Sequence, residues 1–210
     1  LSSEDTGGRN VAIGRYALQD LNTDSNAYNV AIGHNAGGNV TTGTQNTLIG
    51  GLSGDSITTG AFNVAMGYGT LGLEDTGNKS IAIGYSALAT QNYDGDAYNV
   101  AVGHNAGTNI TTGINNTLIG GVAGDALTTG NYNVAIGYGS LSAEDEHSGN
   151  VAVGRFALLS QNAGADAFNT ALGYDAGRNV TTGVENILIG GFAGDSLTTG
   201  SYNTAVGSRA

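Results

Sequence analysis

The sequence lacks proline, cysteine and tryptophan, and it has one methionine and only six basic residues among 210. Without cysteine the chain forms no disulfide, and thiolate chemistry is excluded. Six Lys and Arg against 17 Asp and Glu give a net charge of −11. A nucleic-acid surface needs clustered Lys and Arg, and an acidic protein is repelled by anionic lipid. We therefore expect neither nucleic acid nor membrane as a partner.

Long apolar runs are also missing, so no segment resembles a membrane span or the apolar part of a secretory signal. The chain begins with Leu rather than Met, and we expect a processed or excised segment. What the chain has in abundance is glycine, 37 residues, together with small aliphatic residues spread evenly along it. Such a biased composition points to a repeat protein.

A five-residue phrase recurs twelve times. It reads mostly as Asn, an aliphatic residue, Ala or Leu, a second aliphatic residue and Gly. Successive copies are 17 or 19 residues apart, and four intervals complete a unit of 70 residues, so 1–70, 71–140 and 141–210 are three copies of a four-coil unit. The glycines that end the phrase are Gly14, Gly33, Gly50, Gly67, Gly84, Gly103, Gly120, Gly137, Gly154, Gly173, Gly190 and Gly207.

Each coil is expected to hold two short strands. The first is the phrase itself, and the second is a β-branched run such as Val40, Thr41 and Thr42; both are too short for a helix and lack its periodicity. The glycine after each first strand suits a corner that needs positive φ. The whole chain, 1–210, is thus predicted as one all-β parallel solenoid, and twelve coils at ~4.8 Å give a rod of roughly 55–60 Å.

Stacked coils place equivalent residues above one another, so the Asn of the phrase is expected to form a ladder of amides. Side chains alternate along a strand, so Val11 and Ile13 point one way and Ala12 the other. Both faces are apolar; one fills the interior and the other meets a neighbouring chain, and the sequence leaves open which is which. The ladder residues are Asn10, Asn29, Asn46, Asn63, Asn99, Asn116, Asn133, Asn150, Asn169, Asn186 and Asn203, with Ser80 as the exception.

The phrases "NVAIG" and "NVAVG", followed by a small-residue corner, resemble the head repeats of trimeric autotransporter adhesins of the YadA type. The alternation of "NTLIG" with "TTG" also resembles shaft repeats of phage tail fibres. The resemblance covers essentially the whole chain, although coils of 17 or 19 residues are longer than those of the adhesin family. It implies a left-handed β-roll, usually trimeric, that serves as a stalk or adhesive head on a virion or outside a cell.

Candidate ligand groups are few. Asp94 and Asp96 offer oxygen ligands for Ca²⁺, but they lack the spacing of an EF-hand, and solvated loop acids are the preferred interpretation. His34 and His104 are equivalent residues one unit apart; three copies of His34 on a trimer axis could hold an ion, whereas a surface histidine is the simpler interpretation. Asp55, Asp125 and Asp195 are expected to bond local backbone N–H groups.

Aromatic residues recur just before the phrase and are expected to stack along one corner, in preference to binding carbohydrate; they are Tyr28, Phe62, Tyr98, Tyr132, Phe168 and Tyr202. "GYGTLG" at 67–72 has the glycine spacing of a dinucleotide fingerprint, but no helix follows to receive the pyrophosphate. The "TTG" triplets are interrupted in two of every four coils, which argues against an ice-binding array. No Ser stands beside a base, so we expect neither an enzyme nor a cofactor.

These observations favour a structural and adhesive shaft segment of a trimeric extracellular fibre, either a phage tail fibre or a bacterial surface adhesin. The alternative is a self-assembling extracellular filament, because the segment begins and ends in register with its unit and shows no atypical capping repeat. A glycan lyase is a weaker third hypothesis. A host-surface glycan or receptor is expected to contact the variable insertions at 19–28, 89–98 and 159–168.

Overall fold

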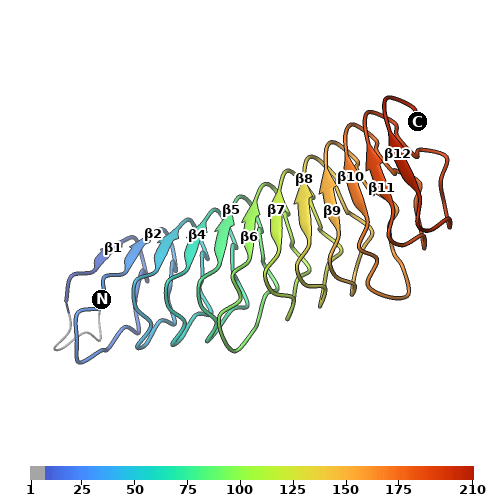
Figure 1. The fold of residues 1–210 in the computed structure, drawn as a ribbon. Helices are drawn as coiled ribbons and strands as arrows, with labels where there is room; N and C mark the ends of the chain where they lie inside the picture. The colour runs from blue at the N-terminus through green and yellow to red at the C-terminus, as the bar shows by residue number, and fades with distance from the viewer. Residues whose placement is uncertain (1–7) are drawn as a thin grey trace.

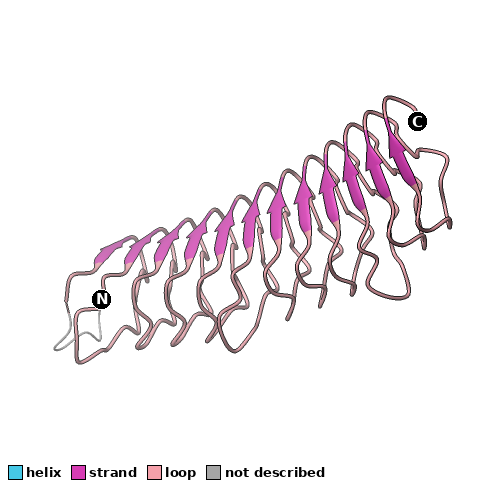
Figure 2. Ribbon diagram, viewed as in Figure 1, coloured by secondary structure: helices cyan, strands magenta, loops and turns pink. Residues whose placement is uncertain are grey.

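The computed structural model describes residues 8–210, which form a rod of stacked coils (Figure 1). Each coil contributes one three-residue strand, and no helix occurs between residues 8 and 210 (Figure 2). The strands are β1 (Val11–Ile13), β2 (Val30–Ile32), β3 (Thr47–Ile49), β4 (Val64–Met66), β5 (Ile81–Ile83), β6 (Val100–Val102), β7 (Thr117–Ile119), β8 (Val134–Ile136), β9 (Val151–Val153), β10 (Thr170–Leu172), β11 (Ile187–Ile189) and β12 (Thr204–Val206).

These strands form a single twelve-stranded sheet in chain order. Every neighbouring pair is parallel and in register, as when Val11 pairs with Val30 and Thr47 pairs with Val64. The offsets repeat the 19- and 17-residue intervals of the sequence, so each residue lies beside its equivalent in the next coil. The prediction of an all-β parallel solenoid is confirmed.

The second predicted strand is wrong. In the segment 40–42, Thr41 and Thr42 form a bend, and no strand occurs there or at the equivalent positions of the other coils within residues 8–210. The N–H groups of Thr41 and Gly43 both donate to one acceptor, the carbonyl of Thr58 in the next coil, at 2.9 and 3.2 Å. A regular parallel ladder uses evenly spaced acceptors, so two donors that converge on one carbonyl keep the coils in register without forming a strand.

The interior of the rod is the face that carries the middle residue of each strand. Ala65 of β4 is fully buried, whereas Val64 is half-buried and Met66 is 37% exposed. The same pattern holds in the other internal strands, where the buried residue is Ala or Leu. The aliphatic residues on either side of it therefore form the outer face.

Leucine and glycine exchange places in the core from coil to coil. In the third coil of each unit the inward residue is Leu, as at Leu118, instead of Ala. A Cβ added to Gly107 or Gly124 would lie 2.6 and 2.8 Å from the methyl groups of Leu118. The fourth coil of one unit and the first coil of the next instead combine Ala in the strand with a buried Leu where these glycines stand, as Ala135 and Leu141 show. One leucine thus fills space in two coils, which makes four coils, rather than one, the repeating unit.

The glycine that follows each strand is required by the adjacent coil. These twelve glycines have φ between +125° and +147°. A Cβ on Gly103 would lie 2.3 Å from the carbonyl oxygen of Gly120, and one on Gly120 would lie 2.5 Å from that of Gly137. Both the backbone conformation and the close approach of coils exclude a side chain here.

Candidate functional site

The outer face of the sheet is apolar and aromatic along the length of the rod. Its side chains come from the residue before the Asn, the first and third residues of the strand, and the residue after the corner glycine. In the sixth coil these are Tyr98, Val100, Val102 and His104. We call this surface the sheet face. The exposed large apolar residues on it are Val11, Ile13, Tyr28, Phe62, Met66, Tyr68, Ile81, Tyr85, Tyr98, Ile119, Tyr132, Tyr138, Phe168, Leu172, Tyr174, Ile187, Tyr202 and Val206.

Elsewhere in the described chain only Tyr16 and Leu73 are large apolar residues with comparable exposure. Exposed apolar residues are therefore concentrated on one of the rod's faces. A soluble monomer rarely shows a contiguous apolar patch of more than a few hundred Å². The sheet face, which runs through twelve coils, is therefore the candidate interaction surface of the rod.

Rings stack in the column that follows the strands. Tyr68 stacks on Tyr85 with centroids 5.7 Å apart, and Tyr85 stacks on His104 at 5.2 Å. The planes are within 13° of parallel, so these rings cover one another's faces. His34 contacts Tyr16 edge to face at 5.9 Å. Because a sugar stacks on an open ring face, the middle ring of this stack, Tyr85, does not offer a carbohydrate platform.

The column that precedes the strands behaves differently, and the predicted stacking of its six aromatics is wrong. No ring contact in residues 8–210 joins two of them. They stand in every second coil, roughly 10 Å apart, which is too far for ring contact. Cations lie over two of the rings instead: Arg9 is 5.4 Å from the centroid of Tyr28, and Lys79 is 5.1 Å from that of Tyr98.

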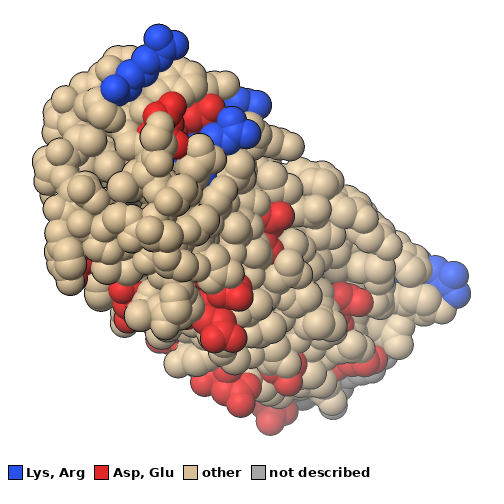
Figure 3. Space-filling view, turned by 90° about the vertical axis from the view of Figure 1, so that its right-hand side faces the viewer, with Lys and Arg blue, Asp and Glu red and all other residues tan. Residues whose placement is uncertain are grey.

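Charge is distributed unevenly around the rod. Arg9 and Lys79 precede the strand, and Arg15 and Arg155 follow the corner glycine, so four of the six basic residues border the sheet face. Glu185 is the one acidic residue at those positions. On the face that Figure 3 shows, most of the visible Asp and Glu side chains lie in the lower part of the view, whereas one acidic group at the top lies beside Lys and Arg. The sheet face is nearly free of negative charge although the chain carries −11.

The asparagines form a ladder along the inner edge of the sheet that is interrupted once, at Ser80. Asn46 is fully buried; its Oδ1 accepts from the backbone N–H of Asn63 at 3.0 Å, and its Nδ2 donates to the carbonyl of Gly60 at 2.8 Å. Direct bonds between two amides also occur, as between Asn116 and Asn99 at 3.2 Å. The ladder thus bonds chiefly through the backbone of the next coil, and it is structural.

The residues proposed as metal ligands do not come together. Asp96 pairs with Lys79 at 2.6 Å, and Asp94 accepts from the hydroxyl of Thr76 at 2.6 Å. His34 lies in the column of residues that follows the strands, where its ring contacts Tyr16. Within residues 8–210 one group of three His or carboxylate side chains has ligand atoms within 4.8 Å of one another, namely Glu144, Asp145 and His147. The sequence pattern did not predict this group. Its one indication in the sequence is His147, which stands where the equivalent position of other coils is glycine, as at Gly77.

The aspartates of the "GD" corners also differ from expectation. The carboxylate of Asp125 accepts from the hydroxyl of Ser142 in the next coil, and that of Asp195 accepts from the hydroxyl of Ser196 at 3.4 Å. The expected bond to local backbone N–H is found for Asp55, whose pKa is nevertheless raised because burial disfavours its charged form. Hydroxyls supplied by the adjacent residue or coil replace the backbone donor at the other two.

A buried polar network interrupts the core at the boundary between units. Gln91 donates to the Oε2 of Glu74 at 2.7 Å and to the hydroxyl of Ser80 at 2.8 Å, and Asn99 donates to Gln91 at 2.9 Å. All four side chains are fully buried. Burial raises the pKa of Glu74, and the bonds from Gln91 and Gly77 oppose it. The next unit boundary carries the same residue types, Glu144 and Gln161, whereas the other coils hold Leu, Ile or Val at these positions.

The insertion at 89–98 borders a shallow hollow of about 520 Å³. Asn92, Tyr93 and Asp94 of the insertion line it together with Asp75 and Thr112. The insertion at 89–98, which is predicted to serve recognition, thus borders a concave surface that carries the ring of Tyr93 and the carboxylates of Asp75 and Asp94.

Comparison with protein-family models, with curated proteins and with solved structures gave no match. In residues 8–210 there is no helix with the length and hydropathy of a membrane span.

Proposed function

We propose that this β-solenoid is a shaft segment of an extracellular fibre in which three copies pack through the sheet face, with an adhesive role at the insertions. The observation that carries the proposal is the sheet face, which is largely apolar and aromatic along the length of the rod and is therefore poorly solvated. A second copy of the chain is its occupant. The resemblance of the "NVAIG" repeats to trimeric adhesin heads and tail-fibre shafts supports three copies and a location on a virion or cell surface.

The size of the face suits a stable assembly. Twelve coils at ~4.8 Å and about seven residues across give an area on the order of 1,000 Å² per chain, and a standard interface buries about 800 Å² per partner. The charge distribution points the same way. Three chains that each carry −11 repel one another unless the acids face outward, and the sheet face has almost none.

Analytical ultracentrifugation and native mass spectrometry test this proposal. We expect a discrete particle of three chains. Ile83→Asp and Ile119→Asp place charges in the middle of the sheet face and should yield monomers, because a buried unpaired carboxylate opposes association. The matched control is Thr129→Asp, an exposed residue on another face, which should remain trimeric.

A monomeric wild-type protein, or variants that assemble as well as wild type, would overturn the proposal. A discrete dimer would be consistent with packing through the sheet face but would exclude an assembly of three copies. Open-ended polymers with an axial repeat near a multiple of the coil spacing would instead support the filament hypothesis. Adhesion is tested separately by comparing the wild type with Tyr93→Ala on a glycan array. Unchanged glycan binding by the variant would exclude the hollow at 89–98 as the adhesion site.

A further inference from the structure

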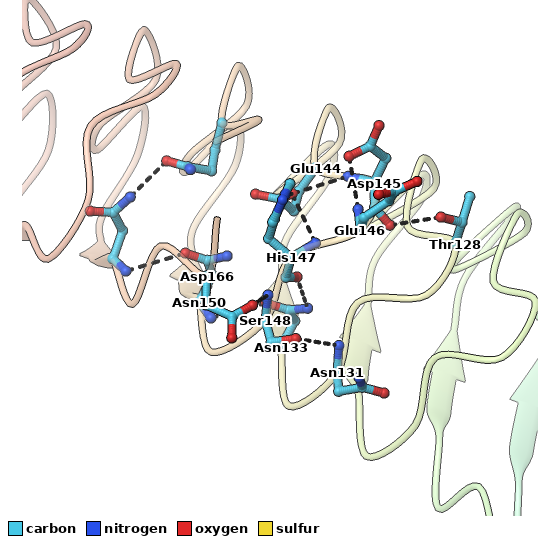
Figure 4. A network of polar contacts seen from close by, with 12 residues as sticks. Thr128, Asn131, Asn133, Glu144, Asp145, Glu146, His147, Ser148, Asn150 and Asp166 are labelled. Carbon is cyan, nitrogen blue, oxygen red and sulfur yellow. Dashed lines mark hydrogen bonds and ion pairs between the residues drawn. The ribbon is translucent and has the colours of Figure 1, made fainter. Parts of the chain in front are cut away.

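We propose that Glu144, Asp145 and His147 form a binding site for a divalent transition cation of the Zn²⁺ type. The three residues lie on one turn of the eighth coil, and Figure 4 shows them close together on it. Their ligand atoms are within 4.8 Å of one another. An imidazole nitrogen with two carboxylates is a donor set that suits Zn²⁺ and its neighbours.

The geometry between histidine and glutamate is that of two adjacent ligands. His147 Nδ1 lies 3.0 Å from Glu144 Oε1. Two ligand atoms each roughly 2.1 Å from a tetrahedral ion are roughly 3.4 Å apart, so side-chain movement of a few tenths of an ångström admits the ion. An ion between them replaces the Nδ1 proton, which leaves to solvent, while Nε2 keeps its hydrogen. Asp145 is half-buried, one of its oxygens accepts from the N–H of Glu146 at 2.8 Å, and the other reaches the ion by side-chain rotation.

Comparison with the preceding unit shows that the buried carboxylate has been redirected toward the histidine. Glu74 bonds to Gln91, and Gly77 stands where the later unit has His147. Glu144 makes no such bond. Its Oε1 contacts the imidazole of His147 and also accepts from the backbone N–H groups of Asp145 and His147. Its Oε2 and the Nε2 of Gln161 have no hydrogen-bond partner in the described chain, although both residues are fully buried.

The negative charge around Glu144 also favours a bound cation. Glu144, Asp145 and Glu146 are consecutive acids, and no Lys or Arg of residues 8–210 forms an ion pair with any of them. Burial raises the pKa of Glu144, and contact with His147 opposes that rise. A divalent ion would compensate the buried charge and occupy the unpaired oxygen, which a hydrogen bond from neutral imidazole does only in part.

Isothermal titration with ZnCl₂ at pH 7.5, in a buffer that does not chelate, tests the site on the whole chain. We expect one ion per chain and a rise in melting temperature that EDTA reverses. His147→Gly recreates the arrangement at Gly77, so it should fold normally, with the melting temperature of wild type in EDTA, and bind Zn²⁺ at least tenfold more weakly.

The matched control is His104→Asn, which removes a histidine of the sheet face and should bind Zn²⁺ as wild type does. Asp145→Asn should weaken binding to a smaller extent. The proposal is wrong if wild type takes up no Zn²⁺, if His147→Gly binds it unchanged, or if His104→Asn loses it. Calcium provides a further arm: because Ca²⁺ prefers oxygen ligands, Ca²⁺ uptake that equals Zn²⁺ uptake in both wild type and His147→Gly would reject an imidazole site.

Discussion

At the scale of single residues, the corners of each coil make two different demands on the backbone. The glycine after each strand has a φ that side chains rarely adopt, and the neighbouring coil leaves no room for a Cβ. Other corner positions are left-handed yet hold ordinary residues, such as Leu88, Tyr98 and Asn105 with φ near +50°. Each such residue costs about 1 kcal/mol or more, and inter-coil bonds such as that from the Leu88 N–H to the carbonyl of Ala106 offset the cost.

Gly120→Ala should destabilise the rod by about 2–4 kcal/mol, because the added methyl group meets the carbonyl of Gly137 and φ is unfavourable for alanine. Urea denaturation followed by circular dichroism measures the effect. Gly164→Ala is the control, since no heavy atom lies within 4 Å of the new Cβ. Equal stability of the two variants would mean that coils are not in contact at the glycine column.

The sequence predicted the glycine corners, because glycine recurs at one position in all twelve coils. The left-handed corners could not be predicted from it. The residue two after the glycine is Tyr16, Leu52 or Val122 in different coils, and these residues share no local signature. Their conformation is imposed by the bonds between coils, which only the folded rod contains.

At the scale of the element, each strand has only three residues, and its stability comes from the neighbours above and below. Parallel pairs of this length are not stable alone, so register depends on what fills the core between coils. Leu118 occupies the space beside Gly107 and Gly124, and this places a specific residue in a specific coil. The middle residue of the strand therefore decides which coils fit together.

Leu118→Ala should cost about 2–5 kcal/mol by opening a cavity across two coils. Adding Gly124→Leu should recover part of that loss, because the coil then has the pattern of Ala135 and Leu141, and the left-handed φ of Gly124 matches that of Leu141. Thermal melts of the single and double variants measure the loss of stability and its partial recovery. A double variant less stable than Leu118→Ala would contradict this account of the core.

The sequence also predicted the first strand of each coil but not the fate of the second segment. Thr-rich runs have strand propensity, and their propensity was overridden by two N–H donors that share one acceptor. The polar site at 144–147 was missed for a related reason. Glu144 and His147 are separated by two acidic residues, so the whole segment resembles a solvated acidic loop. The burial of Glu144 beside His147 depends on the folded coil and could not be predicted from the sequence.

At the scale of the whole molecule, buried acids make stability depend on pH. Burial raises the folded-state pKa of Glu74 and Asp55 above their ordinary values of 4.5 and 3.8. The folded protein then binds more protons than the unfolded chain just above those values. Stability contributed by these groups is fully present below the unfolded pKa and is lost as pH rises through the folded pKa.

We therefore expect a higher urea midpoint at pH 5 than at pH 7.5, a difference that reduced repulsion near the pI of about 4.2 reinforces. The double variant Glu74→Leu with Gln91→Leu removes one of the acids whose pKa is raised and should show a smaller difference; Leu21 already occupies the position equivalent to Gln91. Asp96 opposes the trend, because its bond to Lys79 lowers its pKa, but that pair is exposed and screened. A midpoint that falls on acidification would refute the expectation.

The leucine that fills two coils has a consequence for how such a chain can be inherited. Loss of one coil by recombination, for example 116–132, would leave Gly107 without the side chain that fills its space. Gain or loss of a whole 70-residue unit would keep every leucine beside its two glycines. Genes for rods of this kind should therefore lengthen and shorten in steps of four coils, each about 19 Å, and lineages should differ by unit number rather than by coil number.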